Sequence, residues 1–407
     1  MTSYEFARPH QAFSAGFFKD AGFDFEVRGL LGRAPAGASE PGEVLATIAG
    51  IKDGDATAWH AAWLALGRRL RSLGDALREA EHFDSAAGAY LRAASYLAIA
   101  VNSGDDDRVS GLFGEYSDAW EGFIDTTVYL AERVEIPYEG TVLPGYLVKP
   151  ADDDELRPTI VLVNGSDGSH ASIWGEAAFG ALGRGYNVLL FDGPGQQSML
   201  FERGVGFRPD WETVLTPVVD FLLARSDIDG SRLAVYGISQ GGFWVSRALA
   251  FEPRFAAAIV DPGVTDVSAS WLPNLPAPLA KLFAEGKREA FDRDMALGMR
   301  FSPAIARGWA FRSRPYRQSS PFDTLTAVRG YVLGDLAAKI TTPLFITSPE
   351  HEQFWPGQSQ ELADAVSGEH VVQPFTASEG ANFHCQPLAR TLTQQRMYDW
   401  LDAQFAG

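Results

Sequence analysis

The sequence predicts an α/β fold: a mostly parallel, doubly wound β-sheet preceded by a helical N-terminal region. Three observations predict it. Beyond residue 158, short runs of β-branched residues and leucine alternate with helical segments. These runs are apolar at nearly every position, which is typical of parallel strands that helices cover on both faces. Before residue 132, in contrast, apolar residues recur at the spacing of helices.

Residues 1–131 are predicted to form a helical cap domain. The stretch 1–40 is rich in Phe and Gly and shows no clean period. After it, Gly, Asp and Ser separate segments whose apolar residues recur at helical spacing. The expected helices lie at about residues 43–51, 57–83, 84–101 and 111–130.

Residues 132–407 are predicted to form a second domain that contains the sheet. A β-hairpin is expected at 134–150, where polar turn residues separate two strand-like runs. The parallel strands are then expected at residues 159–163, 187–191, 232–236, 255–260, 341–348 and 370–375. Helical segments lie between most of them, and the chain ends in an amphipathic helix at 392–405.

Residues 264–329 interrupt this alternation with Pro-rich and Phe/Arg-rich sequence. The insertion follows the fourth parallel strand, a position that favours a lid. Its aromatic residues suggest an apolar pocket roofed by the cap, although packing between cap and sheet is the simpler explanation: Trp271, Phe283, Trp309, Phe311 and Tyr316. Its arginines are better explained by a solvated surface than by an anionic ligand: Arg307, Arg312, Arg314 and Arg317.

The length of 407 residues suits two domains, or one large domain with a cap. The net charge of −18 argues against nucleic acid or an anionic membrane as the main partner, since both repel an acidic protein. The first residues lack the pattern of a signal peptide, and no apolar run approaches the roughly 20 residues that span a bilayer. We therefore expect a cytoplasmic protein that binds neither nucleic acid nor membranes.

The strongest functional signal is the motif Gly-Ile-Ser-Gln-Gly at 237–241. It stands between the third parallel strand and a helix, which is the context of a nucleophile elbow. A β-carbon at Gly237 or Gly241 is expected to clash with neighbouring backbone in so tight a turn. The turn would hold the Ser239 hydroxyl above the sheet, at a helix start that favours negative charge. The sequence therefore predicts Ser239 as a nucleophile rather than as a small serine in a structural turn.

A serine nucleophile needs a histidine base later in the chain. Three of the seven histidines follow Ser239. His384 lies in a polar loop between the last strand and the last helix, where the base of such a site belongs. His370 opens a strand, and His351 lies within the loop expected to carry the acid. The sequence therefore predicts His384 as the general base.

The acid is expected in the loop after the strand at 341–348, because the order along the chain is nucleophile, acid, histidine. Glu350 and Glu352 compete for this role. In the common pattern the acid is followed by two residues, a bulky residue and a proline, and then a helix. Glu352 matches this register and is favoured, with Glu350 as the alternative. Its side chain is one methylene longer than aspartate, which the loop must accommodate.

Two backbone N–H groups are expected to bind the oxyanion, those of Gln240 and of Ser166 in the turn Asn-Gly-Ser-Asp-Gly. This chemistry requires no metal and no organic cofactor. Cys385 is the one cysteine, so neither an internal disulfide nor a cysteine-based structural metal site is expected. A nucleotide-binding enzyme is not expected either, because no G-x-G-x-x-G or P-loop motif follows the first parallel strand. Asp192, at the end of the second strand, is expected to fix its loop.

These motifs together resemble a group of capped α/β-hydrolases. The segments that carry the resemblance, besides the N-terminal helices, are 164–169, 191–198, 237–244, 349–359 and 379–385. The group contains the 2,6-dihydroxypseudooxynicotine hydrolase and the fungal heptaketide hydrolases, and the fermentation–respiration switch proteins are more distant relatives. The resemblance implies an α/β-hydrolase fold with a helical cap, cleavage of a C–C bond next to a ketone, and a homodimer with the active site between cap and catalytic domain.

The resemblance also gives the triad roles to Ser239, Glu352 and His384, although aspartate is usual where this chain has Glu352. The predicted function is therefore a serine-dependent hydrolase that cleaves a bond next to a carbonyl in a bulky, aromatic or polyketide-like small molecule. An ester, thioester or amide remains a rival substrate, because the triad alone does not select the bond. A binding or regulatory protein that lost the chemistry is a third reading, and the intact trio argues against it.

Overall fold

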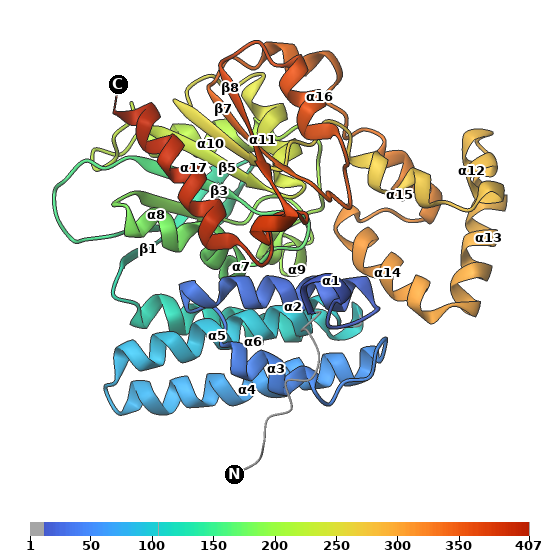
Figure 1. The fold of residues 1–407 in the computed structure, drawn as a ribbon, viewed down its shortest axis with the longest axis horizontal. Helices are drawn as coiled ribbons and strands as arrows, with labels where there is room; N and C mark the ends of the chain where they lie inside the picture. Colours follow the sequence, from blue (N-terminus) through green and yellow to red (C-terminus); the bar gives the residue numbers. More distant parts are fainter. Residues whose placement is uncertain (1–11, 105, 407) are drawn as a thin grey trace.

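The computed structural model describes residues 12–104 and 106–406, and the chain begins with a layer of helices drawn in blue and cyan in Figure 1. These helices are α1 (Ala12–Ala15), α2 (Ala21–Arg33), α3 (Pro41–Ile48), α4 (Ala56–Glu79), α5 (Phe83–Asn102) and α6 (Asp106–Thr126). Helix α5 packs against both α4 and α6. The predicted helical N-terminal region is thus confirmed, and α3 to α6 correspond to the four expected helices.

Helix α2 has no counterpart among the helices expected from the sequence. The Asp20 carboxylate caps it by accepting hydrogen bonds from the backbone N–H groups of Gly22, at 3.0 Å, and Phe23, at 3.1 Å. A β-carbon at Gly32 would lie 1.7 Å from the carbonyl oxygen of Pro387, so α2 lies directly against a distant loop. Because glycine stands at this contact in place of an apolar residue, the sequence lacks the regular spacing of apolar residues that identifies such a helix.

The sheet has eight strands in the order β1-β2-β4-β3-β5-β6-β7-β8. The pairings β1–β2 and β2–β4 are antiparallel, and all the others are parallel. The strands are β1 (Leu130–Tyr138), β2 (Thr141–Lys149), β3 (Thr159–Val163), β4 (Asn187–Phe191), β5 (Leu233–Ile238), β6 (Ala257–Asp261), β7 (Leu344–Pro349) and β8 (His370–Phe375). The predicted, mostly parallel sheet is confirmed, and β3, β4 and β8 have the predicted bounds.

Helices cover both faces of this sheet. One face packs against α7 (His170–Ile173), the π-helical turn η2 (Trp174–Ala178), α8 (Phe179–Gly183) and α17 (Arg390–Phe405). The other face packs against α10 (Glu212–Leu223), α11 (Gly241–Leu249) and α16 (Gln358–Ala365). Short helix α9 (Gln197–Phe201) lies against α6. Two apolar cores result, one on each face of the sheet.

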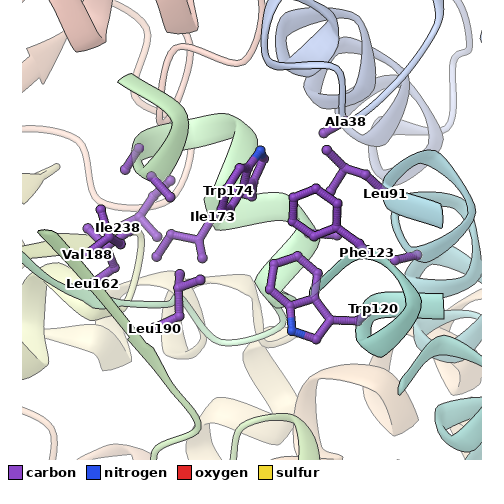
Figure 2. Packing of buried hydrophobic residues seen from close by; sticks show 14 of the residues in the cluster. Ala38, Leu91, Trp120, Phe123, Leu162, Ile173, Trp174, Val188, Leu190 and Ile238 are labelled. Carbon is purple, nitrogen blue, oxygen red and sulfur yellow. The ribbon is translucent and has the colours of Figure 1, made fainter. Parts of the chain in front are cut away.

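The core on the α7 side continues without interruption into the N-terminal helices (Figure 2). Trp120 and Phe123 of α6 pack against Trp174, with ring centroids 6.3 and 4.8 Å away. Arg33 of α2 and Glu176 form an ion pair of 2.8 Å across the same boundary. The N-terminal helices are therefore part of the folded core and not a loosely attached module.

Between β6 and β7 the chain leaves the sheet and forms four helices, drawn in yellow and orange in Figure 1. They are α12 (Ala277–Ala284), α13 (Arg288–Phe301), α14 (Pro303–Ser313) and α15 (Pro321–Val328). The short turn η5 (Arg314–Tyr316) follows α14. None of the helices within the described residues is long and apolar enough to cross a membrane.

Candidate active site

Ser239 stands on a sharp turn between β5 and α11. Its φ angle is +55°, a left-handed conformation that is uncommon for residues other than glycine, and its N–H donates to the carbonyl oxygen of Asp261 at 2.6 Å. A β-carbon at Gly237 would lie 2.3 Å from the Gly241 oxygen, and one at Gly241 would lie 2.8 Å from the Val163 oxygen. The two glycines therefore let three backbone segments meet under the serine.

His384 hydrogen-bonds to both of its predicted partners. Its Nε2 lies 2.9 Å from Ser239 Oγ, and its Nδ1 lies 2.9 Å from each carboxylate oxygen of Glu352. The loops after β5, β7 and β8 bring the three residues together at the carboxyl ends of the parallel strands. In this geometry an imidazole can take the hydroxyl proton while the carboxylate stabilises the positive charge.

The two competing glutamates have different surroundings. Glu352 accepts hydrogen bonds from the N–H groups of Phe354 and Trp355, at 2.9 and 3.2 Å. Burial raises the pKa of Glu352, but the charge of His384 and these hydrogen bonds outweigh it and hold the pKa below its usual value. Glu350 is exposed and accepts the Ala377 N–H at 2.7 Å, so it fastens the loop instead.

Aromatic rings enclose the His384 imidazole, which is 2% exposed as a residue. Phe354 lies 4.7 Å and Trp355 5.5 Å from it, measured between ring centroids. The Phe25 ring of α2 lies 6.2 Å from the imidazole, so the N-terminal helices extend as far as His384. Sequence reasoning missed Phe25, because nothing near it in the chain signals this contact.

The loop after β3 passes directly beside Ser239. A β-carbon at Gly165 would lie 2.9 Å from Ser239 Cβ. The Gln196 side chain fixes this loop, because its Nε2 donates to the carbonyl oxygens of Asn164, at 2.9 Å, and Gly165, at 3.2 Å. Within the part of the chain that the structure describes, the predicted oxyanion donors, the N–H groups of Gln240 and Ser166, donate to no protein acceptor. Both therefore remain available to a ligand.

The loop after β4 is fixed by the residue expected to do so. Asp192 accepts from the Ser198 hydroxyl at 2.5 Å and lies 3.0 Å from His170 Nε2.

The remaining candidate histidines stay apart from the serine. His351 contacts Asn382, and His370 is exposed at the start of β8.

Two carboxyl groups, from Glu26 of α2 and Asp167 of the loop after β3, influence each other beside this site. Both are surrounded by protein yet keep some solvent-accessible surface. Burial raises the pKa of Glu26 to about 7, with Arg33 opposing the rise and Asp167 adding to it. Burial also raises the pKa of Asp167, and Ser166 and the charge of His384 oppose this rise. Sequence reasoning did not identify Glu26, since only the fold places it here.

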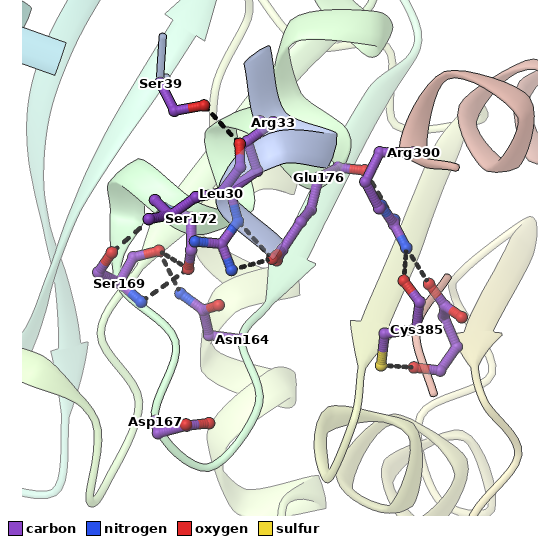
Figure 3. A network of polar contacts seen from close by, with 12 residues as sticks. Leu30, Arg33, Ser39, Asn164, Asp167, Ser169, Ser172, Glu176, Cys385 and Arg390 are labelled. Atoms are coloured by element: carbon purple, nitrogen blue, oxygen red, sulfur yellow. Dashed lines mark hydrogen bonds and ion pairs between the residues drawn. The ribbon is translucent and has the colours of Figure 1, made fainter. Parts of the chain in front are cut away.

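A buried polar network supports the elbow from below (Figure 3). Arg390 of α17 pairs with the carboxylate of Asp261 at 2.8 Å and donates to the carbonyl oxygens of Cys385 and Glu176. Tyr236 donates its hydroxyl to Asp261 at 2.9 Å. Because the Asp261 carbonyl also accepts the Ser239 N–H, the network connects α17 to the elbow.

One expectation about the insertion is wrong. Arg307 and Arg317 are exposed as expected, but Arg312 and Arg314 are partly buried. The guanidinium carbon of Arg312 lies 4.2 Å from the Trp271 ring centroid, and Arg314 Nη2 donates to the carbonyl oxygen of Gly104 at 2.9 Å. Both side chains therefore pack against protein instead of projecting into solvent. Among the described residues, no group of three or more His, Cys, Asp or Glu side chains is arranged to hold a metal ion.

Comparison with protein families matches residues 160–385, more than half of the chain, to a family described as "Alpha/beta hydrolase family". Several fungal proteins are similar over nearly the full length. Hydrolase LUC6 of Fusarium sp is 31% identical and hydrolase acrC of Aspergillus aculeatus is 30% identical, over 97% and 96% of this chain and 98% of each relative. The 20-hydroxy-prefusarin hydrolase FUS2 of Gibberella moniliformis is 29% identical over 98% of both chains.

Solved structures share the fold. The 2,6-dihydroxy-pseudo-oxynicotine hydrolase superimposes with a TM-score of 0.71 at 19% identity, covering 91% of this chain and 94% of its own. AbyA5 superimposes with a TM-score of 0.60 at 17% identity, covering 90% and 94%. Both likenesses extend through the N-terminal helices as well as the sheet, and they confirm the fold that the sequence motifs implied.

Proposed function

The chain belongs to the α/β hydrolase family and is a hydrolase, and on this premise we propose that Ser239, His384 and Glu352 form its catalytic triad. One observation carries the proposal: the His384 imidazole hydrogen-bonds at 2.9 Å to the serine hydroxyl on one side and to a buried carboxylate on the other. The exposed Glu350 makes no such contact within the described chain.

In the proposed reaction, Ser239 Oγ attacks a carbonyl carbon while His384 Nε2 takes the hydroxyl proton. The resulting oxyanion binds the N–H groups of Gln240 and Ser166, and each such donor typically lowers the barrier by about 3 kcal/mol. The tetrahedral intermediate collapses, and the leaving group receives the proton from His384. Water then attacks the acyl-serine, with His384 again as base, and releases a carboxylic acid.

We propose further that the bond cleaved is a C–C bond next to a ketone in a bulky aromatic or polyketide-like molecule. Two facts support it. The relatives include a 20-hydroxy-prefusarin hydrolase and, among solved structures, a 2,6-dihydroxy-pseudo-oxynicotine hydrolase. The aromatic side chains of Phe25, Phe354 and Trp355 around His384 also suit an aromatic substrate.

A fluorophosphonate probe tests the nucleophile. It is expected to label the wild-type protein covalently and to leave the Ser239→Ala variant unlabelled, as measured by intact mass. Ser246→Ala is the matched control: this serine is fully buried in α11, seven residues further on, and its loss should leave labelling unchanged. Equal labelling of wild type and Ser239→Ala would disprove the proposed nucleophile. Turnover of p-nitrophenyl butyrate and of the 1,3-diketone 1-phenyl-1,3-butanedione then separates ester from C–C cleavage.

A further inference from the structure

The insertion places an unpartnered hydroxyl beside the nucleophile elbow. Tyr316 of η5 is 3% exposed, and its ring packs edge-on against Trp271, Phe207 and Tyr331, at centroid distances of 5.6, 5.2 and 5.5 Å. Within the described chain its hydroxyl has no hydrogen-bond partner. Burial raises the pKa of Tyr316, and a side-chain hydrogen-bonding interaction with Gln240 opposes the rise. The hydroxyl thus faces the side chain of the residue that follows Ser239, although the two groups do not meet at ordinary hydrogen-bond geometry.

The Gln240 side chain is itself unsatisfied. The residue is 3% exposed, and its Nε2 finds no acceptor among the residues that the structure describes. A buried amide nitrogen without a partner is unfavourable, because it has given up its hydrogen bonds to water. The Tyr316 hydroxyl and the Gln240 amide therefore face each other without a hydrogen bond of ordinary length, and an oxygen atom placed between them would accept from both.

Arg312 of α14 adds a positive charge to the same corner. Its Nη2 donates only to the carbonyl oxygen and hydroxyl of Ser270, at 3.3 and 3.2 Å, and no ion pair joins it to a carboxylate in the described residues. Other arginines with little exposure do have such partners: Arg33 with Glu176, Arg247 with Glu212 and Arg390 with Asp261. A partly buried, unpaired guanidinium is costly unless an anion binds there.

Electrostatic contacts connect this corner to the triad. Burial lowers the pKa of Arg312, and the nearby Tyr316 and Asp167 oppose the effect. Asp167 in turn lies close enough to His384 to feel its charge. Arg312 and Tyr316 both pack against Trp271, and the Tyr316 hydroxyl faces Gln240, so the three groups form one corner beside Ser239.

We propose that Arg312, Tyr316 and Gln240 bind the oxygen that becomes negative on the departing fragment, an enolate or phenolate oxygen. The inference rests on the proposed C–C cleavage and extends it. When the tetrahedral intermediate collapses, the C–C bond breaks and its electron pair moves into the conjugated carbonyl or ring. The negative charge appears on that second oxygen, opposite the acyl oxyanion. His384 then transfers the proton taken from Ser239 to the departing carbon, which restores a neutral fragment.

Ester cleavage needs no such site, because a p-nitrophenolate leaving group is already stable in water. We therefore expect Arg312→Met and Tyr316→Phe to lower kcat for 1-phenyl-1,3-butanedione by about 100-fold, the typical effect of one lost oxyanion donor. Turnover of p-nitrophenyl butyrate should stay within about threefold of wild type, since its oxyanion donors are untouched. Arg307→Met, on the exposed face of α14, is the matched control and should change neither rate. Equal losses on both substrates, or none, would overturn the proposal.

A binding measurement in the Ser239→Ala protein tests the site without turnover. The enolate of 1-phenyl-1,3-butanedione absorbs at longer wavelength than its enol, so a pH titration reports the pKa of the bound diketone. That pKa should lie below the value in water and should rise by about one unit or more with Arg312→Met, but not with Arg307→Met. An unchanged titration, or no binding, would overturn the proposed site. Failure of the catalytic proposal is distinguishable, because it appears as absent fluorophosphonate labelling or absent diketone cleavage by wild type.

Discussion

The nucleophile elbow and the groups that face it are held by different kinds of contact. Around the elbow, backbone meets backbone: a β-carbon at Gly242 would lie 2.2 Å from the Pro262 oxygen, and the Ser239 N–H bonds the Asp261 oxygen. On the facing side, side chains of α2 and of the insertion make the contacts. The Phe25 ring lies 6.2 Å from the His384 ring, and the Arg312 guanidinium stacks over Trp271.

This difference separates chemistry from selectivity. Backbone contacts at such distances admit no larger residue, so the elbow keeps one geometry whatever the substrate. Contacts between side chains tolerate substitution far better, so α2 and the insertion can change the shape of the site without disturbing the triad. We call these facing groups, Phe25, Glu26, Arg312 and Tyr316, the roof of the site.

The largest effect is expected from removing half of the roof. Deleting residues 1–129, up to the start of β1, should abolish turnover and expose apolar surface, because Trp120 and Phe123 cover Trp174. Turnover of the preferred substrate, dye binding and gel filtration measure this. A monomeric, active truncation would show that the roof is dispensable. Phe25→Ala tests the same contact in an intact fold, where a roughly 10-fold lower kcat/KM corresponds to about 1.4 kcal/mol.

Next in size is the effect of neutralising Glu352, the proposed triad acid. Glu352→Gln keeps the shape of the side chain but removes the charge that stabilises a protonated His384. We expect kcat to fall by about 10⁴-fold, the loss typical of an amide in this position. Glu350→Gln, two residues away and exposed, is the matched control and should stay within about threefold, since it touches only the Ala377 N–H. The reverse ranking in steady-state assays would reassign the acid to Glu350.

The sequence was sufficient to predict the sheet and the residues that follow its strands, because short local patterns of residues determine both. Strands β3, β4 and β8 were located to the residue, because strands inside a parallel sheet give short apolar runs bounded by turn residues. Ser239 and His384 could be identified as candidate site residues from the sequence, because a contiguous motif marks the serine and the order along the chain marks the histidine. Their juxtaposition in the structure followed from the parallel sheet, whose carboxyl ends lie along one edge.

The roof was not predictable in the same way, because its residues acquire their role through contacts across long stretches of chain. Helix α2 carries a buried Arg28, whose guanidinium donates to the carbonyl oxygens of Ala12, at 3.2 Å, and Phe13, at 3.0 Å. Four charged residues and three glycines in this 13-residue helix obscure the regular spacing of its apolar residues. Arg312 likewise looks like a surface residue until the insertion folds back on Trp271.

The smallest effect concerns Glu26, whose pKa is raised to about 7, mainly by burial. The charge of Arg33 opposes this rise, whereas the charges of Asp167 and Glu176 add to it. In the unfolded chain Glu26 ionises near 4.5. Between these two pKa values the folded protein holds a proton that the unfolded chain has lost, so this residue makes the free energy of unfolding fall as pH rises. The destabilisation of the folded protein by Glu26 is absent below about pH 4.5 and complete above about pH 7. It amounts to at most about 3 kcal/mol.

Glu26→Gln should therefore leave stability unchanged at pH 4 and increase it by on the order of 1–3 kcal/mol at pH 8. Urea denaturation across this range measures the difference. Glu79→Gln, at the exposed end of α4, is the control and should give a constant offset. If the Glu26→Gln and wild-type curves run parallel from pH 4 to 8, Glu26 ionises normally in the folded protein. The roof would then hold a solvated carboxylate beside Asp167, and a polar rather than an apolar substrate face would be expected there.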